Sequence, residues 1–344
     1  MKTFPKTIAL LSGVALLASS AFAQSVATGP VGYKTVTIKG DEGLTLLGVE
    51  FLTAASYTGQ VTGVGTNSVT VSGADFDALL ESGKSYFLDL VDSATVANIG
   101  INTSIVSWSG STLTIGDDLD GLLDVNADSI AIHELPTIGG LFGVGGDILA
   151  GGSATTADLI YMPNPDGAGL ISVYYSTGGF AGVGWRQVGA GNADKNDLPI
   201  YFTDGLYVLK KSSGDVDMTL TGSVKMSSNA LVVEEGFTPF STVFPSGITF
   251  SNSGLYDAEN PNESITSGSA TTADLVYAAA YLEGDADADG QTIGAYYYSS
   301  GGFAGVGWRR VGAGNADMSA AQLGSGFGIL KQSGSTVLSR VAPY

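Results

Sequence analysis

A long motif occurs twice in this chain, and it constrains the fold more than any other feature of the sequence. The two copies, Gly179–Asp194 and Gly302–Asp317, differ at a single position. The same eight residues, Gly-Ser-Ala-Thr-Thr-Ala-Asp-Leu, precede both copies and start at Gly152 and Gly268. The duplicated unit is longer than the roughly 20 to 50 residues of a solenoid repeat. We therefore expect two related folded units rather than a repeat array.

The spacing between the shared blocks shows that copy two carries an insertion. The eight-residue blocks are offset by 116 residues and the glycine-rich motifs by 123, so about seven residues are added near Glu283–Gln291. Residues Gly29–Leu52 weakly echo Gly222–Phe250, which makes the first third of the chain a candidate for a degenerate third copy. The expected parts are a signal peptide (1–23), an N-terminal β region (24–135), β repeat copy one (136–222) and β repeat copy two with linking strands (223–344).

The first 23 residues have the three parts of a secretory signal peptide. Lys2 and Lys6 supply positive charge, Ile8–Ala18 is apolar, and Ala21–Ala23 is a small-x-small cleavage site. We expect a mature N-terminus at Gln24 and a location in the periplasm, at the cell surface or outside the cell. The apolar run is too short to span a bilayer, and no later stretch reaches eighteen apolar residues. No transmembrane helix is therefore expected.

The composition is that of an acidic, folded β protein. The formal net charge is -19, and loss of the two lysines of the signal peptide makes it -21. Nucleic acid is thereby disfavoured as a partner, because it is bound through basic patches. The 50 glycines and 44% apolar residues are typical of a folded chain with many strands and turns. With no cysteine and one histidine, thiol chemistry is excluded and transition-metal sites are disfavoured.

Alternating apolar and polar segments predict an all-β fold of sandwich or barrel-like units, with internal duplication and few short helices. The segment Asp75–Gly83 has the pattern of a short helix, with Asp75 at its N-cap and Gly83 as its stop. An outer-membrane β-barrel is an alternative architecture for an exported β protein. The repeated glycine-rich loops fit that alternative poorly.

Three aspartates alternate within the insertion of copy two, in Asp-Ala-Asp-Ala-Asp-Gly. They are Asp285, Asp287 and Asp289. Ca²⁺ binds about six to eight oxygen ligands, and the glycine permits the tight turn that such a loop needs. An EF-hand is excluded, because Tyr296 occupies the twelfth position where a glutamate is required. The three aspartates are thus a candidate Ca²⁺ site of structural rather than catalytic role, and a solvated acidic hairpin loop is the alternative.

Trp185 and Trp308, with Arg186 and Arg309 beside them, are the candidate binding residues. Each pair could form a stacking platform for a sugar or an aromatic ligand. The alternative is that both indoles anchor the core. Because neighbouring side chains on a strand face opposite ways, an inward tryptophan would then turn its arginine outward.

No catalytic residue can be assigned. Asp158 and Asp274 stand in identical surroundings, where we expect them to cap a helix or to accept from turn amides. His133 lies in an alternating strand, and nothing in the chain resembles a nucleophile elbow. A pair of carboxylates that act together in a hydrolase would leave no local signature.

Several short motifs lie along the mature chain. They are Gly29–Tyr33, Pro136–Ile138, Leu141–Gly143, Ala157–Ile160, Tyr174–Tyr175, Gly184–Trp185, Leu206–Val208, Gly222–Val224, Pro245 and Ile248. Together with the signal peptide they make the chain resemble an uncharacterised family of secreted proteins found as paralogues in verrucomicrobial bacteria. The resemblance implies an envelope or extracellular location and no particular activity.

These observations favour an exported, non-enzymatic β protein of the cell envelope or extracellular space. Its role would be structural, or it would bind a glycan or another protein at the cell surface. A secreted carbohydrate-active hydrolase with an Asp/Glu pair is the first alternative, and the outer-membrane β-barrel is the second. A cleft with two carboxylates and an aromatic lining would support the hydrolase.

Overall fold

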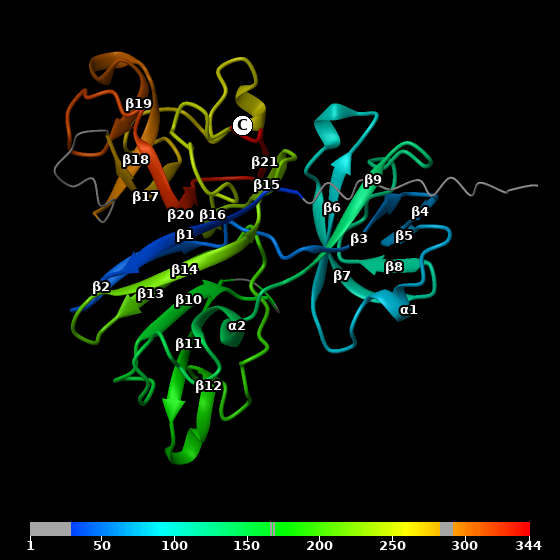
Figure 1. The fold of residues 1–344 in the computed structure, drawn as a ribbon. Coiled ribbons are helices and arrows are strands. Elements are labelled where there is room, and N and C mark those ends of the chain that lie inside the picture. Colours follow the sequence, from blue (N-terminus) through cyan, green and yellow to red (C-terminus); the bar gives the residue numbers. More distant parts are fainter. Residues whose placement is uncertain (1–28, 166, 168, 283–291) are drawn as a thin grey trace, which may run out of the picture.

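The computed structural model describes residues 29–165, 167, 169–282 and 292–344, so the segment expected to be a signal peptide lies outside it. Nearly all regular structure in this part of the chain is antiparallel β-sheet (Figure 1). Its two α-helices have four and five residues, which confirms the predicted all-β class with few short helices. No helix of the described residues is long and apolar enough to cross a bilayer. The helical segments are α1 (Phe76–Leu79), α2 (Ile138–Phe142), η1 (Val96–Asn98), η2 (Gly179–Ala181), η3 (Pro261–Glu263) and η4 (Gly302–Ala304).

The first unit packs a five-stranded sheet, in the order β12-β11-β10-β13-β2, against the two-stranded sheet β1-β14. Apolar side chains of both sheets share one core, which includes Ile38, Leu47, Val173 and Trp185. The strands are β1 (Val31–Ile38), β2 (Gly43–Gly48), β10 (Leu159–Pro163), β11 (Leu170–Thr177), β12 (Val183–Gln187), β13 (Gly205–Lys210) and β14 (Val216–Ser223).

The second unit has the same architecture. Its five-stranded sheet runs β16-β20-β17-β18-β19, and its two-stranded sheet is β15-β21. Val233, Phe240, Tyr296 and Trp308 belong to its core. The strands are β15 (Asn229–Val233), β16 (Gly236–Ser241), β17 (Leu275–Tyr281), β18 (Ile293–Ser300), β19 (Val306–Arg310), β20 (Gln322–Lys331) and β21 (Thr336–Arg340).

The sequence duplication is thus also a duplication of topology. Read from the same edge, β12-β11-β10-β13-β2 corresponds strand by strand to β19-β18-β17-β20-β16, and β1-β14 corresponds to β15-β21. The weak echo between Gly29–Leu52 and Gly222–Phe250 coincides with the first two strands of each unit, β1 and β2 in one and β15 and β16 in the other. Strands β1 and β2 therefore belong to the first unit.

A seven-stranded sheet is built wholly from residues between β2 and α2, in the order β3-β9-β6-β7-β8-β5-β4. It has its own core, which includes Val69, Phe76, Leu88 and Ile130. We call it the inserted domain, because the chain leaves the first unit after β2 and returns to it at α2. The region 24–135 therefore holds both this domain and strands β1 and β2. The strands are β3 (Ala55–Gln60), β4 (Gly63–Gly65), β5 (Ser68–Thr70), β6 (Tyr86–Asp92), β7 (Asn102–Ser109), β8 (Thr112–Ile115) and β9 (Ser129–Glu134).

The two units touch each other through their backbones. A Cβ atom on Gly326 of β20 would lie 2.9 Å from the carbonyl carbon of Leu47, and one on Gly205 of β13 would lie 2.6 Å from the carbonyl oxygen of Phe240. Gly205 and Gly326 occupy corresponding positions, and so do Leu47 and Phe240. The reciprocal contacts indicate an approximate twofold relationship between the units. Only glycine permits this approach, since any side chain would push the strands apart.

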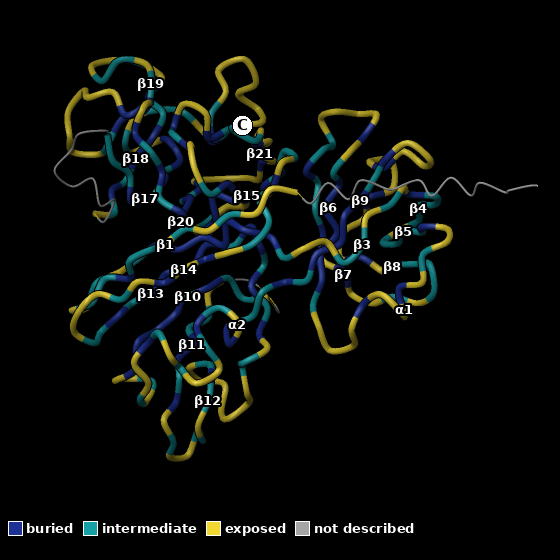
Figure 2. Tube along the Cα trace, viewed as in Figure 1, coloured by how far each residue is buried: buried dark blue, intermediate teal, exposed yellow. Residues whose placement is uncertain are grey.

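The inserted domain joins the rest of the molecule through buried aromatic and polar side chains. The ring of Phe87 stacks on Phe202 of the first unit, with ring centroids 4.3 Å apart, and on His133 at 5.3 Å. Asp89 of β6 pairs with Lys225, which lies between β14 and β15. Figure 2 shows buried residues concentrated along the centres of the sheets, whereas the hairpin tips are exposed.

Candidate functional site

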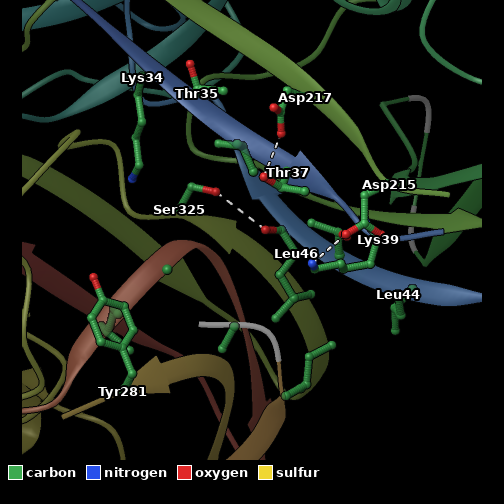
Figure 3. Close-up of a pocket in the computed structure, with 16 residues that line it drawn as sticks. Lys34, Thr35, Thr37, Lys39, Leu44, Leu46, Asp215, Asp217, Tyr281 and Ser325 are labelled. Carbon is green, nitrogen blue, oxygen red and sulfur yellow. Dashed lines mark hydrogen bonds and ion pairs between the residues drawn. The ribbon is translucent and has the colours of Figure 1, made fainter. Parts of the chain in front are cut away.

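A cleft of about 620 Å³ lies between the two units, beside the glycine contacts (Figure 3). Strands β1 and β2 and the chain entering β14 form the wall from the first unit. Strands β17, β18 and β20 form the wall from the second unit. Because both units contribute, the cleft exists only through the duplication.

Hydrogen-bonded polar side chains line the wall formed by the first unit. Thr37 and Asp217 stand opposite each other in the β1-β14 register, and the threonine hydroxyl donates to Asp217 Oδ1 at 2.7 Å. Lys39 Nζ lies 2.6 Å from Asp215 Oδ2, and the amide of Gly40 donates to Asp215 Oδ1 at 3.0 Å. These contacts fix the two carboxylates at the rim of the cleft.

The wall of the second unit contributes an aromatic ring and a hydroxyl. Tyr281 is the last residue of β17, and its hydroxyl donates to Gln322 Oε1 at 2.9 Å, which holds the ring in place. The ring lies on the same wall as Ser325, and Leu46 of the first unit stands beyond Ser325 (Figure 3). A half-buried tyrosine in this setting offers an apolar face with a polar edge.

Both lysines of the cleft are paired with carboxylates, whereas Asp217 has only the Thr37 hydroxyl as its partner. Lys34 Nζ lies 2.9 Å from Oε1 and 2.8 Å from Oε2 of Glu50, a carboxylate behind β1 that is only 2% exposed. Burial raises the pKa of Glu50, and the nearby Lys34 opposes that effect. The hydrogen bond from Lys39, with that from the Gly40 amide, lowers the pKa of Asp215. Both lysines are thus neutralised locally, so the cleft presents no unpaired positive charge to a ligand.

The state of Asp215 bears on the hydrolase alternative. A glycosidase with two carboxylates needs one of them protonated near neutral pH, which requires a raised pKa. The pKa of Asp215 is instead lowered, so this carboxylate stays ionised. Asp215 therefore suits the acceptance of hydrogen bonds and is unsuited to the role of general acid.

The structure places both candidate tryptophans in the cores of their units. Trp185 is 0% exposed and Trp308 is 2% exposed. Trp185 packs edge-on against Tyr175, and its indole nitrogen donates to the carbonyl of Gly143 at 2.8 Å. Neither indole face is accessible, so the stacking platform considered from the sequence does not form. Both tryptophans instead anchor the cores of their units, which is the alternative stated above.

The adjacent arginines are buried as well, against the expectation that an inward tryptophan turns its neighbour outward. Arg186 and Arg309 are each 7% exposed. Arg186 curls back along the hairpin and donates to the carbonyls of Ala181, Val183 and Trp185 at 2.6, 2.8 and 2.7 Å. Strand alternation sets the direction of Cβ only, and a long side chain can return to its own backbone. The arginines therefore bind the chain itself and are closed to a ligand.

Asp158 and Asp274 hold loops together, the structural role expected from the sequence. Asp158 is buried and accepts from the amides of Ala150 at 2.8 Å, Lys211 at 2.8 Å and Ser212 at 2.9 Å. Asp274 does the same in the second unit, where Lys331 Nζ also lies 3.1 Å from it. Neither carboxylate is free to meet a ligand.

The predicted calcium ligands Asp285, Asp287 and Asp289 lie outside the described residues. Within the described part of the chain, no group of three or more His, Cys, Asp or Glu side chains is placed to hold a metal ion. His133 is buried, its ring stacks on that of Phe87, and its Nδ1 lies 2.8 Å from the carbonyl oxygen of Thr53. Burial lowers the pKa of His133.

Sequence reasoning missed the residues of the cleft, among them Thr37, Asp217 and Tyr281. Thr37 and Asp217 are 180 residues apart in the chain, and Tyr281 comes from the other unit. The available signal was the echo between Gly29–Leu52 and Gly222–Phe250, because it places β1 in the first unit. Comparison with protein-family models, with curated proteins and with solved structures found no match for this chain.

Proposed function

We propose that this protein is an exported, non-enzymatic binding protein that takes a neutral saccharide in the cleft between its two units. The observation that carries this proposal is the chemistry of the cleft. Hydroxyl and carboxylate groups stand on one wall and the ring of Tyr281 on the other, with both lysines neutralised by carboxylates. A sugar presents hydroxyls that pair with such groups and a C–H face that packs on an aromatic ring.

The same residues are the reason why we propose binding without catalysis. Asp215 is held ionised by Lys39 and the Gly40 amide, so it does not supply the proton that cleavage of a glycosidic bond requires. Asp217 is occupied by the hydroxyl of Thr37. The proposed site therefore binds its ligand through hydrogen bonds and ring contact, without a reaction. The exported location is supported by the signal-peptide pattern of residues 1–23.

The experiment is a binding screen of the mature chain, from Gln24 onward, on an array of neutral oligosaccharides. Any saccharide that binds is then titrated by calorimetry against the wild type and Tyr281→Ala. Loss of the ring is expected to weaken binding at least about tenfold, which corresponds to roughly 1.4 kcal/mol. Tyr33→Ala is the matched control, because Tyr33 lies on β1, is 77% exposed and stays outside the cleft lining.

Two results would contradict the proposal. One is an array on which no neutral saccharide binds, and the other is binding that Tyr281→Ala leaves unchanged. The same saccharide is incubated with the protein and searched for new reducing ends. A product that Asp217→Asn abolishes would replace the binding role with the hydrolase alternative. Purified mature protein whose first residue precedes the predicted cleavage site would contradict the export prediction.

A further inference from the structure

The tips of two hairpins expose apolar side chains in the same arrangement. Between β11 and β12, Phe180 is 92% exposed and Val183 is 64% exposed. Between β18 and β19, Phe303 is 94% exposed and Val306 is 65% exposed. We call these two segments, 178–183 and 301–306, the phenylalanine tips. A phenylalanine this exposed is unfavourable in water, and here the same exposure occurs twice.

Each phenylalanine tip is held in one shape. Gly178, Gly179 and Gly182 have φ of 141°, 73° and 69°, a region of backbone conformation that side chains rarely adopt. The buried guanidinium of Arg186 fastens the tip from below through the carbonyls of Ala181 and Val183. In each unit a buried arginine therefore stabilises the turn that exposes the phenylalanine.

Several backbone polar groups of the tip are satisfied before any partner arrives. The carbonyls of Ala181 and Val183 accept from Arg186, the amide of Gly182 donates to the carbonyl of Gly179 at 3.2 Å, and the hydroxyl of Ser176 donates to the carbonyl of Gly178 at 3.2 Å. The corresponding bonds recur in the second unit. In hydrocarbon an unpaired backbone group costs several kcal/mol, so this internal pairing suits a tip that enters an apolar medium.

The tip segments carry no charged side chain, and the arginine below each tip is paired with an exposed aspartate, Asp194 or Asp317. The stretch from Tyr175 to Trp185 contains no Asp, Glu, Lys or Arg, and neither does the stretch from Tyr298 to Trp308. The rest of the chain is strongly acidic, with a net charge of -19. An uncharged apolar tip on an acidic body fits a neutral apolar partner and is repelled by an anionic one.

The two tips lie at opposite ends of the molecule, at the β11-β12 hairpin and at the β18-β19 hairpin (Figure 1). One flat surface therefore cannot receive both. We propose that each phenylalanine tip inserts into the outer layer of a zwitterionic lipid bilayer, so that one molecule links two bilayers. The phenylalanine and valine enter the acyl region, and Arg186 and Arg309 stay below with their hydrogen bonds intact.

We favour a bilayer over a protein partner because the tips offer few polar groups for specific contacts. Hot spots of protein interfaces combine an apolar residue with satisfied polar contacts around it. Here several backbone groups of the tip are already bound to its own chain, and the tip segments carry no polar side chain that could specify a partner. A second copy of the chain is disfavoured because two small tips bury far less than the roughly 1,200 Å² of a stable interface.

The test uses the mature full chain and vesicles of phosphatidylcholine alone. Flotation measures binding, and light scattering measures clustering of the vesicles. We expect the wild type to float with the vesicles and to cluster them. Phe180→Ser and Phe303→Ser should each keep flotation within about twofold, because one tip suffices, and should abolish clustering. The double substitution should lower partitioning by roughly 30-fold, the effect of removing one buried phenylalanine from each contact.

Tyr33→Ser, which removes an exposed aromatic ring away from the tips, is the control and should change neither readout. Both phenylalanines are more than nine-tenths exposed, so melting curves of the variants should match that of the wild type. A wild type that does not float overturns the proposal, as does flotation that survives the double substitution. Self-association without vesicles that the double substitution removes would instead assign the tips to contacts between copies of the chain.

Discussion

Lys225 donates to Asp89, and this ion pair ties the inserted domain to the segment between the two units. Both side chains are 1% exposed, so the pair is shielded from water and from salt. Burial lowers the pKa of Lys225, while the neighbouring Asp89 opposes that effect. The hydroxyl of Ser227 accepts from Lys225 at 3.0 Å. A pair of this kind costs stability when one partner is lost, because the other charge remains buried.

Lys225→Met should therefore destabilise the protein. The uncompensated carboxylate of Asp89 would lower the free energy of unfolding by about 3 to 5 kcal/mol. The double variant Asp89→Leu/Lys225→Met should recover most of that loss, since it removes both charges. Denaturant unfolding measures each value, and Lys84→Met, which breaks an exposed pair with Glu134, serves as the control. A single variant as stable as the control would show that the buried pair contributes nothing.

Asp204 should make stability depend on pH. Burial raises the pKa of Asp204 from 3.8 to about 7, with an opposing hydrogen bond involving the backbone of Tyr201. The folded state thus binds the proton more tightly than the unfolded state. The stability that this tighter proton binding gives the folded state is fully present below pH 4 and is lost as pH rises through 7. The total change is up to about 4 kcal/mol, at about 1.4 kcal/mol for each pKa unit.

Asp204→Asn removes this titration and tests the assignment. The difference in free energy of unfolding, variant minus wild type, should become more positive as pH rises from 4 to 8. The gain should level off above pH 8, where Asp204 is ionised. Parallel pH profiles for the two proteins would mean that the Asp204 carboxyl keeps its ordinary pKa.

Gly326→Ala should separate the two units locally. The new Cβ would lie 2.9 Å from the backbone of Leu47, closer than real contacts allow, and backbone cannot move aside as a flexible side chain can. We expect a loss of roughly 2 to 3 kcal/mol, in the range of other overpacked sites. Gly63→Ala is the matched control on strand β4, where the nearest atom is 3.4 Å away. Equal melting temperatures for the two variants would contradict a tight contact between the units.

Arg309→Lys should loosen the tip around Phe303. Lysine has one donor group in place of the fork that reaches the carbonyls of Ala304, Val306 and Trp308. Buried carbonyls left without a donor cost about 1 to 3 kcal/mol each. Chymotrypsin, which cleaves after phenylalanine, should cut at Phe303 faster in the variant, as followed by mass spectrometry. Cleavage at the corresponding tip of the first unit provides the internal reference, because its arginine is intact.

The calcium prediction rests on the sequence alone, since its three aspartates lie outside the described residues. Titration of the mature chain with Ca²⁺ should raise the melting temperature, because a ligand that binds only the folded state stabilises it. Asp287→Ala should remove that rise. A melting temperature that Ca²⁺ leaves unchanged in the wild type would dismiss the site.

The duplicated motif was sufficient to predict two similar units, because nearly identical sequences in equivalent surroundings fold alike. The inserted domain was harder to delimit, since the pairing of β1 with β14 joins residues such as Thr37 and Asp217 that lie 180 positions apart. Neither strand carries the shared motif. Long-range pairing of this kind is decided by tertiary contacts and leaves no local pattern.

The candidate residues show the same limit at the scale of side chains. Trp185 was expected either to face a ligand or to anchor the core, and burial decides for the core. The burial of Arg186 was not predicted, because alternation fixes only the direction of its Cβ atom, while its guanidinium returns to the carbonyls of its own hairpin. The cleft residue Tyr281 carries no sequence signal, since the opposite wall of the cleft comes from the other unit.

The insertion after β2 also sets an order of events during synthesis. The inserted domain pairs strands that are close in the chain, such as Tyr86 with Ile105, and can form as soon as it is made. Strands β1 and β2 are made first, yet their partners β14 and β13 appear only after that domain and the rest of the first unit. Closing so long a loop is slow. Strands β1 and β2 are therefore the last strands of the first unit to pair. Until they pair, their exposed edges can associate with other chains and need protection.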